Sequence, residues 1–131
     1  ELYNRVDIAL DTFPYNGTTT TCQALLMGVP VISIVGEHHM SRVGLSILTN
    51  LGFEFFAAPT PEQYIARAVA LASKPDSLAK IRDTMRDRMR ASSLCNKAVF
   101  AKRMEDAYRL MWHIWCQKHN NVLFKTSAQQ L

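Results

Sequence analysis

Two short apolar runs, each followed by a loop and then a helical pattern, constrain the fold of this chain more than any other feature. Residues 6–11 end in Asp11, and residues 31–35 are mostly β-branched and end before Gly36. Uninterrupted apolar runs of this length are typical of strands buried on both faces of a parallel sheet. Residues 53–58 are expected to form a third short strand. Alternation of such strands with helices predicts an α/β fold.

Capping residues, prolines and glycines mark the expected helix boundaries. Threonines at residues 18–21 favour a helix start, and Gly28 favours a stop, so a short helix is predicted between them. Thr60 followed by Pro61 marks another helix start. Apolar residues at helical spacing predict the remaining helices, which cover residues 41–51 (with Ser41 as the cap), 61–73, 75–91 and 97–118.

Length and composition favour one folded domain of an ordinary globular type. The chain has 131 residues, of which 48% are hydrophobic and 20% charged, enough to bury a core. Three cysteines without CxxC spacing favour a reducing, cytoplasmic location over a disulfide framework. No apolar run reaches the roughly 18 residues of a transmembrane helix, so no membrane partner is expected. We expect a lobe at residues 1–118, cut just upstream of its first strand, and a flexible tail at residues 119–131.

The positive charge of the chain lies in its second half. Residues 1–60 carry two basic and five acidic residues, a charge of −3, and residues 61–131 carry 13 basic and six acidic residues, a charge of +7. Bases and acids alternate along the predicted helices there, which is typical of solvated helix faces. No nucleic-acid motif accompanies them. We therefore expect no nucleic-acid partner, and a regulatory nucleic acid or phospholipid is the less favoured alternative.

The loop after the first strand carries the clearest binding chemistry. Ligands of open α/β sheets bind beyond the carboxyl ends of the strands, and the first N–H groups of a helix attract anions. Amides and hydroxyls of Thr18, Thr19 and Thr20 can therefore hold a phosphate, and Gly17 permits its close approach. Gln23 lies one turn further and can reach a ribose. The alternative is a threonine helix cap without a ligand. A site of amides and hydroxyls suits a diphosphate and requires no metal.

A second loop, after the second strand, offers weaker candidates. Glu37, His38 and His39 can contact a sugar or phosphate there, although an exposed loop without a ligand is favoured. The adjacent histidines lack a third metal ligand at a suitable spacing. Arg42 can face phosphate, but a structural role is favoured. For Asp11 we favour hydrogen bonds that hold the following turn.

Two further groups of residues are interpreted as structural. Cys22 lies on the first helix, where a buried and inert thiol is favoured. An apolar stripe on the last helix is favoured as a packing surface over a recognition surface. It comprises Met104, Tyr108, Met111, Trp112 and Trp115.

Several segments resemble one enzyme family. They are Asp-Thr-Phe-Pro-Tyr-Asn-Gly with the following four threonines and Cys22 at residues 11–22, Gly-Val-Pro-Val at residues 28–31, and Ser-Arg-Val-Gly at residues 41–44. Together they resemble the C-terminal catalytic lobe of the O-GlcNAc transferase/SPINDLY family. The resemblance covers roughly residues 5–116 and is specific in the threonine block.

The resemblance implies a metal-independent, inverting glycosyltransferase of the GT-B type, in which this Rossmann-like C-terminal half binds the nucleotide sugar. It implies transfer of a sugar to Ser or Thr of a protein, most often GlcNAc from UDP-GlcNAc. A SPINDLY-like enzyme using GDP-fucose and a non-catalytic scaffold are the alternatives.

The resemblance places the donor diphosphate at residues 18–20 and the ribose at Gln23, where the family usually has Asp or Glu. The catalytic groups, the N-terminal lobe and tetratricopeptide repeats are expected upstream, so this chain alone is not expected to turn over. The last helix is expected to return toward the other lobe, so part of its apolar stripe would be exposed here.

Overall fold

The computed structural model describes the backbone of residues 2–127 and the side chains of residues 2–119. The chain divides into two compact units, residues 1–96 and residues 97–131. The first unit holds a three-stranded sheet with four α-helices, and the second consists of one long helix. Within the described residues, no helix combines the length and apolar character needed to cross a membrane.

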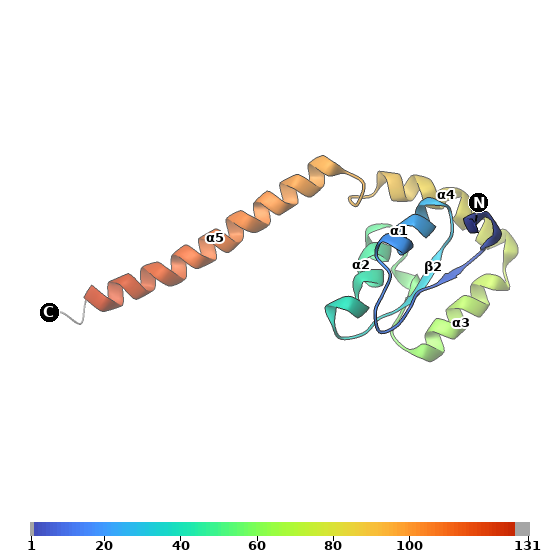
Figure 1. The fold of residues 1–131 in the computed structure, drawn as a ribbon, viewed down its shortest axis with the longest axis horizontal. Helices are drawn as coiled ribbons and strands as arrows, with labels where there is room; N and C mark the ends of the chain where they lie inside the picture. The colour runs from blue at the N-terminus through green and yellow to red at the C-terminus, as the bar shows by residue number, and fades with distance from the viewer. Residues whose placement is uncertain (1, 128–131) are drawn as a thin grey trace. The chain divides into compact units, whose positions relative to one another are not determined.

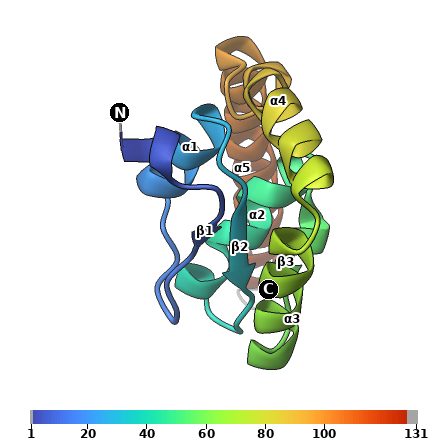
Figure 2. The same ribbon diagram turned by 90° about the vertical axis from the view of Figure 1, so that its right-hand side faces the viewer.

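The sheet of the first unit is parallel, as the sequence predicts. Its order is β1-β2-β3, formed by Ala9–Leu10, Val31–Ile34 and Ala57–Ala58. Ala9 pairs with Val31, and Ser33 pairs with Ala57. Helices α1 (Thr19–Leu26) and α2 (Val43–Asn50) cover one face of the sheet, and α3 (Pro61–Ala72) covers the other (Figures 1 and 2). The predicted α/β fold is therefore confirmed.

Helix boundaries follow the local signals in most places. The hydroxyl of Thr60 accepts a hydrogen bond from Gln63 N at the start of α3, and Pro61 occupies its first position, as predicted. Gly28 and Gly52 end α1 and α2 with φ of 77° and 71°, values that favour glycine. Helix α4 spans Pro75–Ala91, as expected, and α5 spans Lys97–Ser127, past its predicted end at residue 118. The flexible tail remains a prediction, and residues 128–131 lie outside the described residues.

Three local expectations are wrong. The first strand is only Ala9–Leu10, preceded by a 3-10 helix at Leu2–Arg5. Ser41 does not cap α2; it ends a separate 3-10 helix, His39–Ser41, and its hydroxyl donates to His38 O. Within the predicted third strand, Glu54–Phe56 form a 3-10 helix.

The aromatic residues before β3 explain that third difference. Phe53 and Phe56 are both buried, and their rings stack with centroids 5.7 Å apart. Side chains three residues apart lie on the same side of a 3-10 helix but on opposite faces of a strand. Burial of both rings in one core therefore favours the helical turn.

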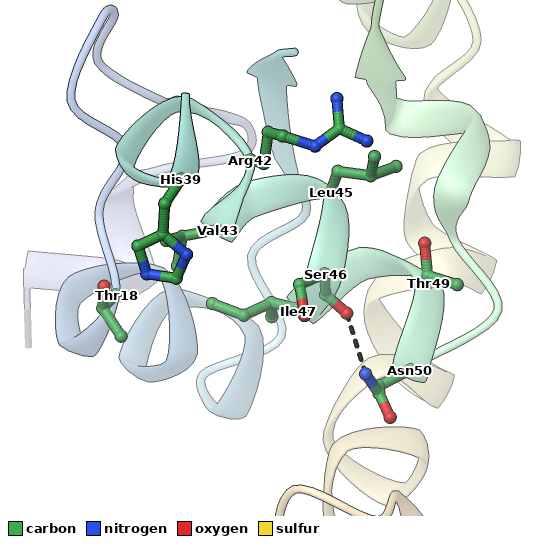
Figure 3. Close-up of a pocket in the computed structure, with 9 residues that line it drawn as sticks. All are labelled: Thr18, His39, Arg42, Val43, Leu45, Ser46, Ile47, Thr49 and Asn50. Carbon is green, nitrogen blue, oxygen red and sulfur yellow. Dashed lines mark hydrogen bonds between the residues drawn. The ribbon is translucent and has the colours of Figure 1, made fainter. Parts of the chain in front are cut away.

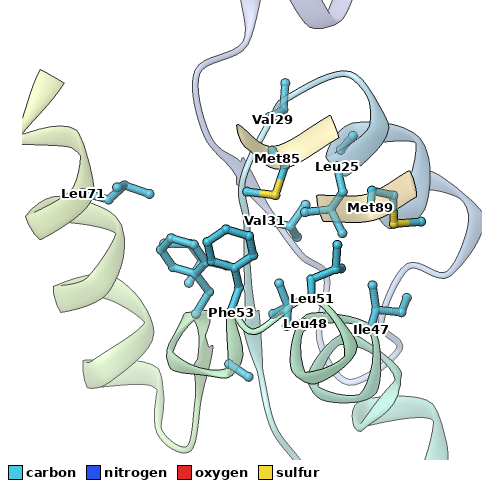
Figure 4. Close-up of a cluster of buried hydrophobic side chains, with 14 of the residues drawn as sticks. Leu25, Val29, Val31, Ile47, Leu48, Leu51, Phe53, Leu71, Met85 and Met89 are labelled. Carbon is cyan, nitrogen blue, oxygen red and sulfur yellow. The ribbon is translucent and has the colours of Figure 1, made fainter. Parts of the chain in front are cut away.

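One hydrophobic core lies between the sheet and its helices (Figure 4). Leu25 of α1, Ile32 of β2, Leu48 of α2 and Met85 of α4 are completely buried in it. Phe56 is buried as completely and is the largest of these side chains. The core thus joins the sheet to helices α1, α2 and α4.

The apolar stripe of α5 is exposed in the described structure. Trp112 and Trp115 stack with ring centroids 5.3 Å apart, and both are more than half exposed. Met104, Tyr108 and Met111 are exposed as well. The packing role of this stripe and the expected return of the last helix toward another lobe stay predictions.

We predict that Phe56→Ala lowers the free energy of unfolding by about 3–5 kcal/mol, because it removes a completely buried ring from the core. The neighbouring Phe55 is 56% exposed, and Phe55→Ala is the matched control, with an expected loss below about 1 kcal/mol. Urea denaturation followed by circular dichroism measures both. Equal losses for the two variants would contradict this placement of the core.

Candidate functional site

The carboxylate of Asp11, at the end of β1, organises the loop that leads to α1. Its Oδ1 accepts hydrogen bonds from Thr12 N at 3.0 Å and from Gly17 N at 2.8 Å. Its Oδ2 accepts from Ser33 Oγ of β2 at 2.7 Å. Hydrogen bonds to a carboxylate are stronger than those between neutral groups. The predicted role of Asp11 in holding the turn is confirmed, and the bond to Ser33 extends that role to the sheet.

The backbone of Asp11 is held from the other face of the sheet. The hydroxyl of Tyr64, on α3, donates to Asp11 O at 3.0 Å. Burial raises the pKa of Tyr64, and the negative charge of Asp11 raises it further. Tyr64 therefore stays neutral and keeps its donor proton. Helices on both faces thus help to position this loop.

Glycine is needed at position 17 because the loop passes close to the threonine side chains at the start of α1. Neither Asn16 nor Gly17 has a positive φ, so backbone conformation is not the reason for the glycine. A Cβ on Gly17 would lie 2.6 Å from the hydroxyl of Thr20 and 2.7 Å from that of Thr21. Absence of a side chain therefore lets the loop pass closely over the first turn of α1.

The four threonines at the start of α1 divide into two kinds. Thr18, Thr19 and Thr20 are exposed, and their hydroxyls make no hydrogen bond within residues 2–119. Thr21 is buried, and its hydroxyl donates to Gly17 O at 2.9 Å. The expected threonine cap is therefore wrong in detail, because Thr18 occupies the cap position without a side-chain cap bond. Three exposed threonines therefore lie at the helix start, where the first N–H groups have no partner within the helix.

A cavity of about 670 Å³ lies beside this helix start (Figure 3). Thr18 lines it together with His39 and Arg42, and the His39 imidazole is directed toward Thr18. The remaining lining residues come from α2 and are Val43, Leu45, Ser46, Ile47, Thr49 and Asn50. The structure thus places residues from both predicted loops on one cavity.

The other predicted site residues lie elsewhere. Gly17 and Thr20 line a separate cavity of about 180 Å³ beside Asp11. Gln23 is exposed on α1, and Glu37 and His38 are exposed but line neither cavity. The predicted phosphate-binding residues therefore lie around the start of α1 and line two cavities, the larger with Thr18 and the smaller with Gly17 and Thr20.

Of the candidates in the second loop, His39 and Arg42 line the larger cavity, whereas Glu37 and His38 do not. The guanidinium of Arg42 points away from Thr18, and its Nη1 donates to Gly36 O at 3.1 Å, in agreement with the favoured structural role (Figure 3). His39, rather than His38, reaches the cavity, because His38 is extended and the 3-10 helix begins at His39. Nothing in the sequence distinguishes these adjacent histidines.

Asn16 is the main residue whose role the sequence did not indicate. It is 1% exposed, and its Nδ2 donates to Thr12 O at 3.0 Å. Its Oδ1 accepts from Gly44 N at the start of α2, at 3.2 Å, and its own N–H donates to Met40 O at 2.9 Å. The side chain therefore joins the first loop to the start of α2, next to the second loop.

Glycine at position 44 allows α2 to approach this buried polar centre. A Cβ there would collide with the hydroxyl of Ser33 and lie 2.9 Å from Asp11 Oδ2.

The thiol of Cys22, on α1, has a raised pKa. Burial raises this pKa, and the charge of Cys95 raises it further, which agrees with the expectation of an inert cysteine. Within the residues that the structure describes, no group of three His, Cys, Asp or Glu side chains is placed to hold a metal ion.

Comparison with known proteins identifies relatives of this chain. The family model described as glycosyl transferase family 41 matches residues 4–104. A protein of Arabidopsis thaliana named probable UDP-N-acetylglucosamine--peptide N-acetylglucosaminyltransferase SPINDLY is 44% identical over 117 residues, which cover 89% of this chain and 13% of that protein. A UDP-N-acetylglucosamine--peptide N-acetylglucosaminyltransferase of Caenorhabditis elegans is 34% identical over 106 residues, which cover 81% of this chain and 9% of that protein.

A solved structure supports the same relationship. It is a variant of the O-GlcNAc transferase of Thermobaculum terrenum, with a TM-score of 0.80 and 40% sequence identity. The match covers 88% of this chain and 22% of that one. This likeness confirms the fold expected for the C-terminal lobe of a GT-B enzyme, although the chain spans only about an eighth of the Arabidopsis relative. The chain belongs to glycosyl transferase family 41.

Proposed function

We propose that this chain is the donor-binding part of a protein O-glycosyltransferase, and that residues 18–20 hold the diphosphate of a nucleotide sugar. The observation that carries the proposal is the set of three exposed hydroxyls at the N-terminus of α1, on a loop held by Asp11. Relatives named as peptide N-acetylglucosaminyltransferases support transfer of GlcNAc from UDP-GlcNAc to Ser or Thr. GDP-fucose is the alternative donor for a SPINDLY-like enzyme.

The geometry suits stabilisation of a leaving group. Negative charge develops on the diphosphate as the bond to the sugar breaks, and preorganised donors at that position lower the barrier. Thr18, Thr19 and Thr20 supply hydroxyl donors, and the helix supplies N–H groups and the positive end of its dipole. These donors act without a metal ion.

The rest of the reaction is proposed to come from other parts of a longer enzyme. The chain spans 13% of its Arabidopsis relative. We assign base recognition to a loop upstream of residue 1, the catalytic groups to the N-terminal lobe, and acceptor selection to that lobe and the tetratricopeptide repeats. Gln23 would contact the ribose. A neutral amide forms a weaker contact than a carboxylate does, and this one feature favours a non-catalytic scaffold as the second candidate function.

We predict that Thr19→Val and Thr20→Val each weaken binding of UDP or GDP about tenfold, because each removes one hydrogen bond to a charged group, worth about 1.5 kcal/mol. Thr84→Val is the matched control, since Thr84 is exposed on α4 and bonds only to its own helix. Isothermal titration of the full protein that carries this chain gives the dissociation constants.

Nuclear magnetic resonance provides the second measurement for this proposal. Titration with UDP and GDP should shift the amide signals of residues 17–23, and transfer to a Ser/Thr peptide should follow with UDP-GlcNAc or GDP-fucose. No shift with either nucleotide would overturn the transferase proposal. Binding without transfer from either donor would favour the scaffold.

Gln23→Glu is expected to strengthen nucleotide binding up to about tenfold, because a carboxylate accepts stronger hydrogen bonds from ribose hydroxyls. Gln23 is exposed, so the change should leave folding intact. Gln117→Glu makes the same charge change on α5 and is the control. Equal affinities for the parent and Gln23→Glu would exclude Gln23 as a ribose ligand.

A further inference from the structure

We propose that Asn16 is a positioning residue for the nucleotide-sugar site: its buried amide holds the loop that carries Thr18 against the loop that carries His39. The inference rests on the proposed function, because it concerns the geometry of the same site. Asn16 is two residues before Thr18, and it bonds to two residues at the C-terminal side of the second loop. Its backbone N–H donates to Met40 O, and its Oδ1 accepts from Gly44 N in the first turn of α2.

The hydrogen bonds of Asn16 use both halves of its amide. The Nδ2 group donates to Thr12 O, within its own loop, and Oδ1 accepts from Gly44 N, at the start of α2. Together with the backbone bond to Met40 O, they cross from the first loop to the second at two points. A side chain that is 1% exposed leaves no room for water to replace these bonds.

Other residue types of similar size cannot supply both bonds. Aspartate keeps an acceptor for Gly44 N but sets a carboxylate oxygen against Thr12 O. Leucine fills the volume and satisfies neither group. Alanine leaves the N–H of the buried Gly44 and the carbonyl of Thr12 without these bonds. The identity of the side chain is therefore set by the two loops that it joins.

The connection reaches the proposed ligand because the two loops line one cavity. Thr18 comes from the first loop and His39 from the second, and the His39 imidazole is directed toward Thr18 (Figure 3). The backbone N–H of Asn16 donates to the carbonyl of Met40, directly after His39, and the side-chain bond to Gly44 N holds the backbone of Asn16 beside the second loop. A displacement of about 1 Å between groups that contact one ligand is enough to weaken binding strongly.

A purely structural asparagine would lower stability without changing the affinity of the folded protein. The test therefore compares Asn16→Ala with Leu71→Ala, which removes a buried side chain of α3 on the other face of the sheet. Both variants are studied in the full protein, at a temperature at which circular dichroism shows each to be folded. UDP and GDP are the binding probes.

We expect Asn16→Ala to weaken nucleotide binding at least tenfold and to raise KM for the nucleotide sugar. Leu71→Ala should bind within twofold of the parent. Hydrogen exchange of the Gly44 amide should become faster in Asn16→Ala and stay unchanged in Leu71→Ala. Asn16→Asp keeps the acceptor for Gly44, so its affinity should lie between those of the parent and Asn16→Ala, and it serves if Asn16→Ala does not fold.

Failure of the inference and failure of the proposed function differ in their results. If the parent binds nucleotide and the Asn16 variants bind as tightly as Leu71→Ala, Asn16 only stabilises the fold and the inference is overturned. If the parent itself binds neither UDP nor GDP, the proposed function fails, and the inference fails with it.

Discussion

The candidate site depends on the carboxylate of Asp11, which forms hydrogen bonds both to the loop before α1 and to strand β2. It accepts two backbone N–H groups from the following loop and a hydroxyl from β2. A strand end and a loop would otherwise be free to separate, because β1 contains only two residues. Asp11 thus fixes the loop before the threonines to the sheet, and Asn16 fixes this loop to the start of α2, next to the second loop. Helix α3 adds to this from the opposite face through Tyr64.

Features that depend on local sequence could be predicted. The parallel sheet follows from short β-branched runs, and the start of α3 follows from Thr60 and Pro61, because each signal acts within a few residues. The position of the threonine run at a helix start was equally accessible. The turn before β3 was not, since Phe53 and Phe56 are apolar in either conformation, and their burial in a common core decides between strand and 3-10 helix.

Features of the site that depend on distant partners could not be predicted. Asn16 is an ordinary turn residue by sequence, and its bond to Gly44 joins residues 28 positions apart. The choice of His39 over His38 depends on where a 3-10 helix begins. The division of the threonines, with Thr21 buried and its three predecessors exposed, depends on how closely Gly17 passes over α1. Such partners become visible only when the chain is folded.

The close packing at Gly17, Gly36 and Gly44 has a consequence for how this corner of the protein can change. At each of these glycines, a Cβ would come within 3 Å of a side chain of a neighbouring element or loop. A side chain at any of these three positions would require neighbouring atoms to move, so the path of the loops is constrained there. The exposed Phe13 and Tyr15 can be replaced without such a collision. Substitution of such exposed side chains changes the surface of the loop, while the path of its backbone stays the same.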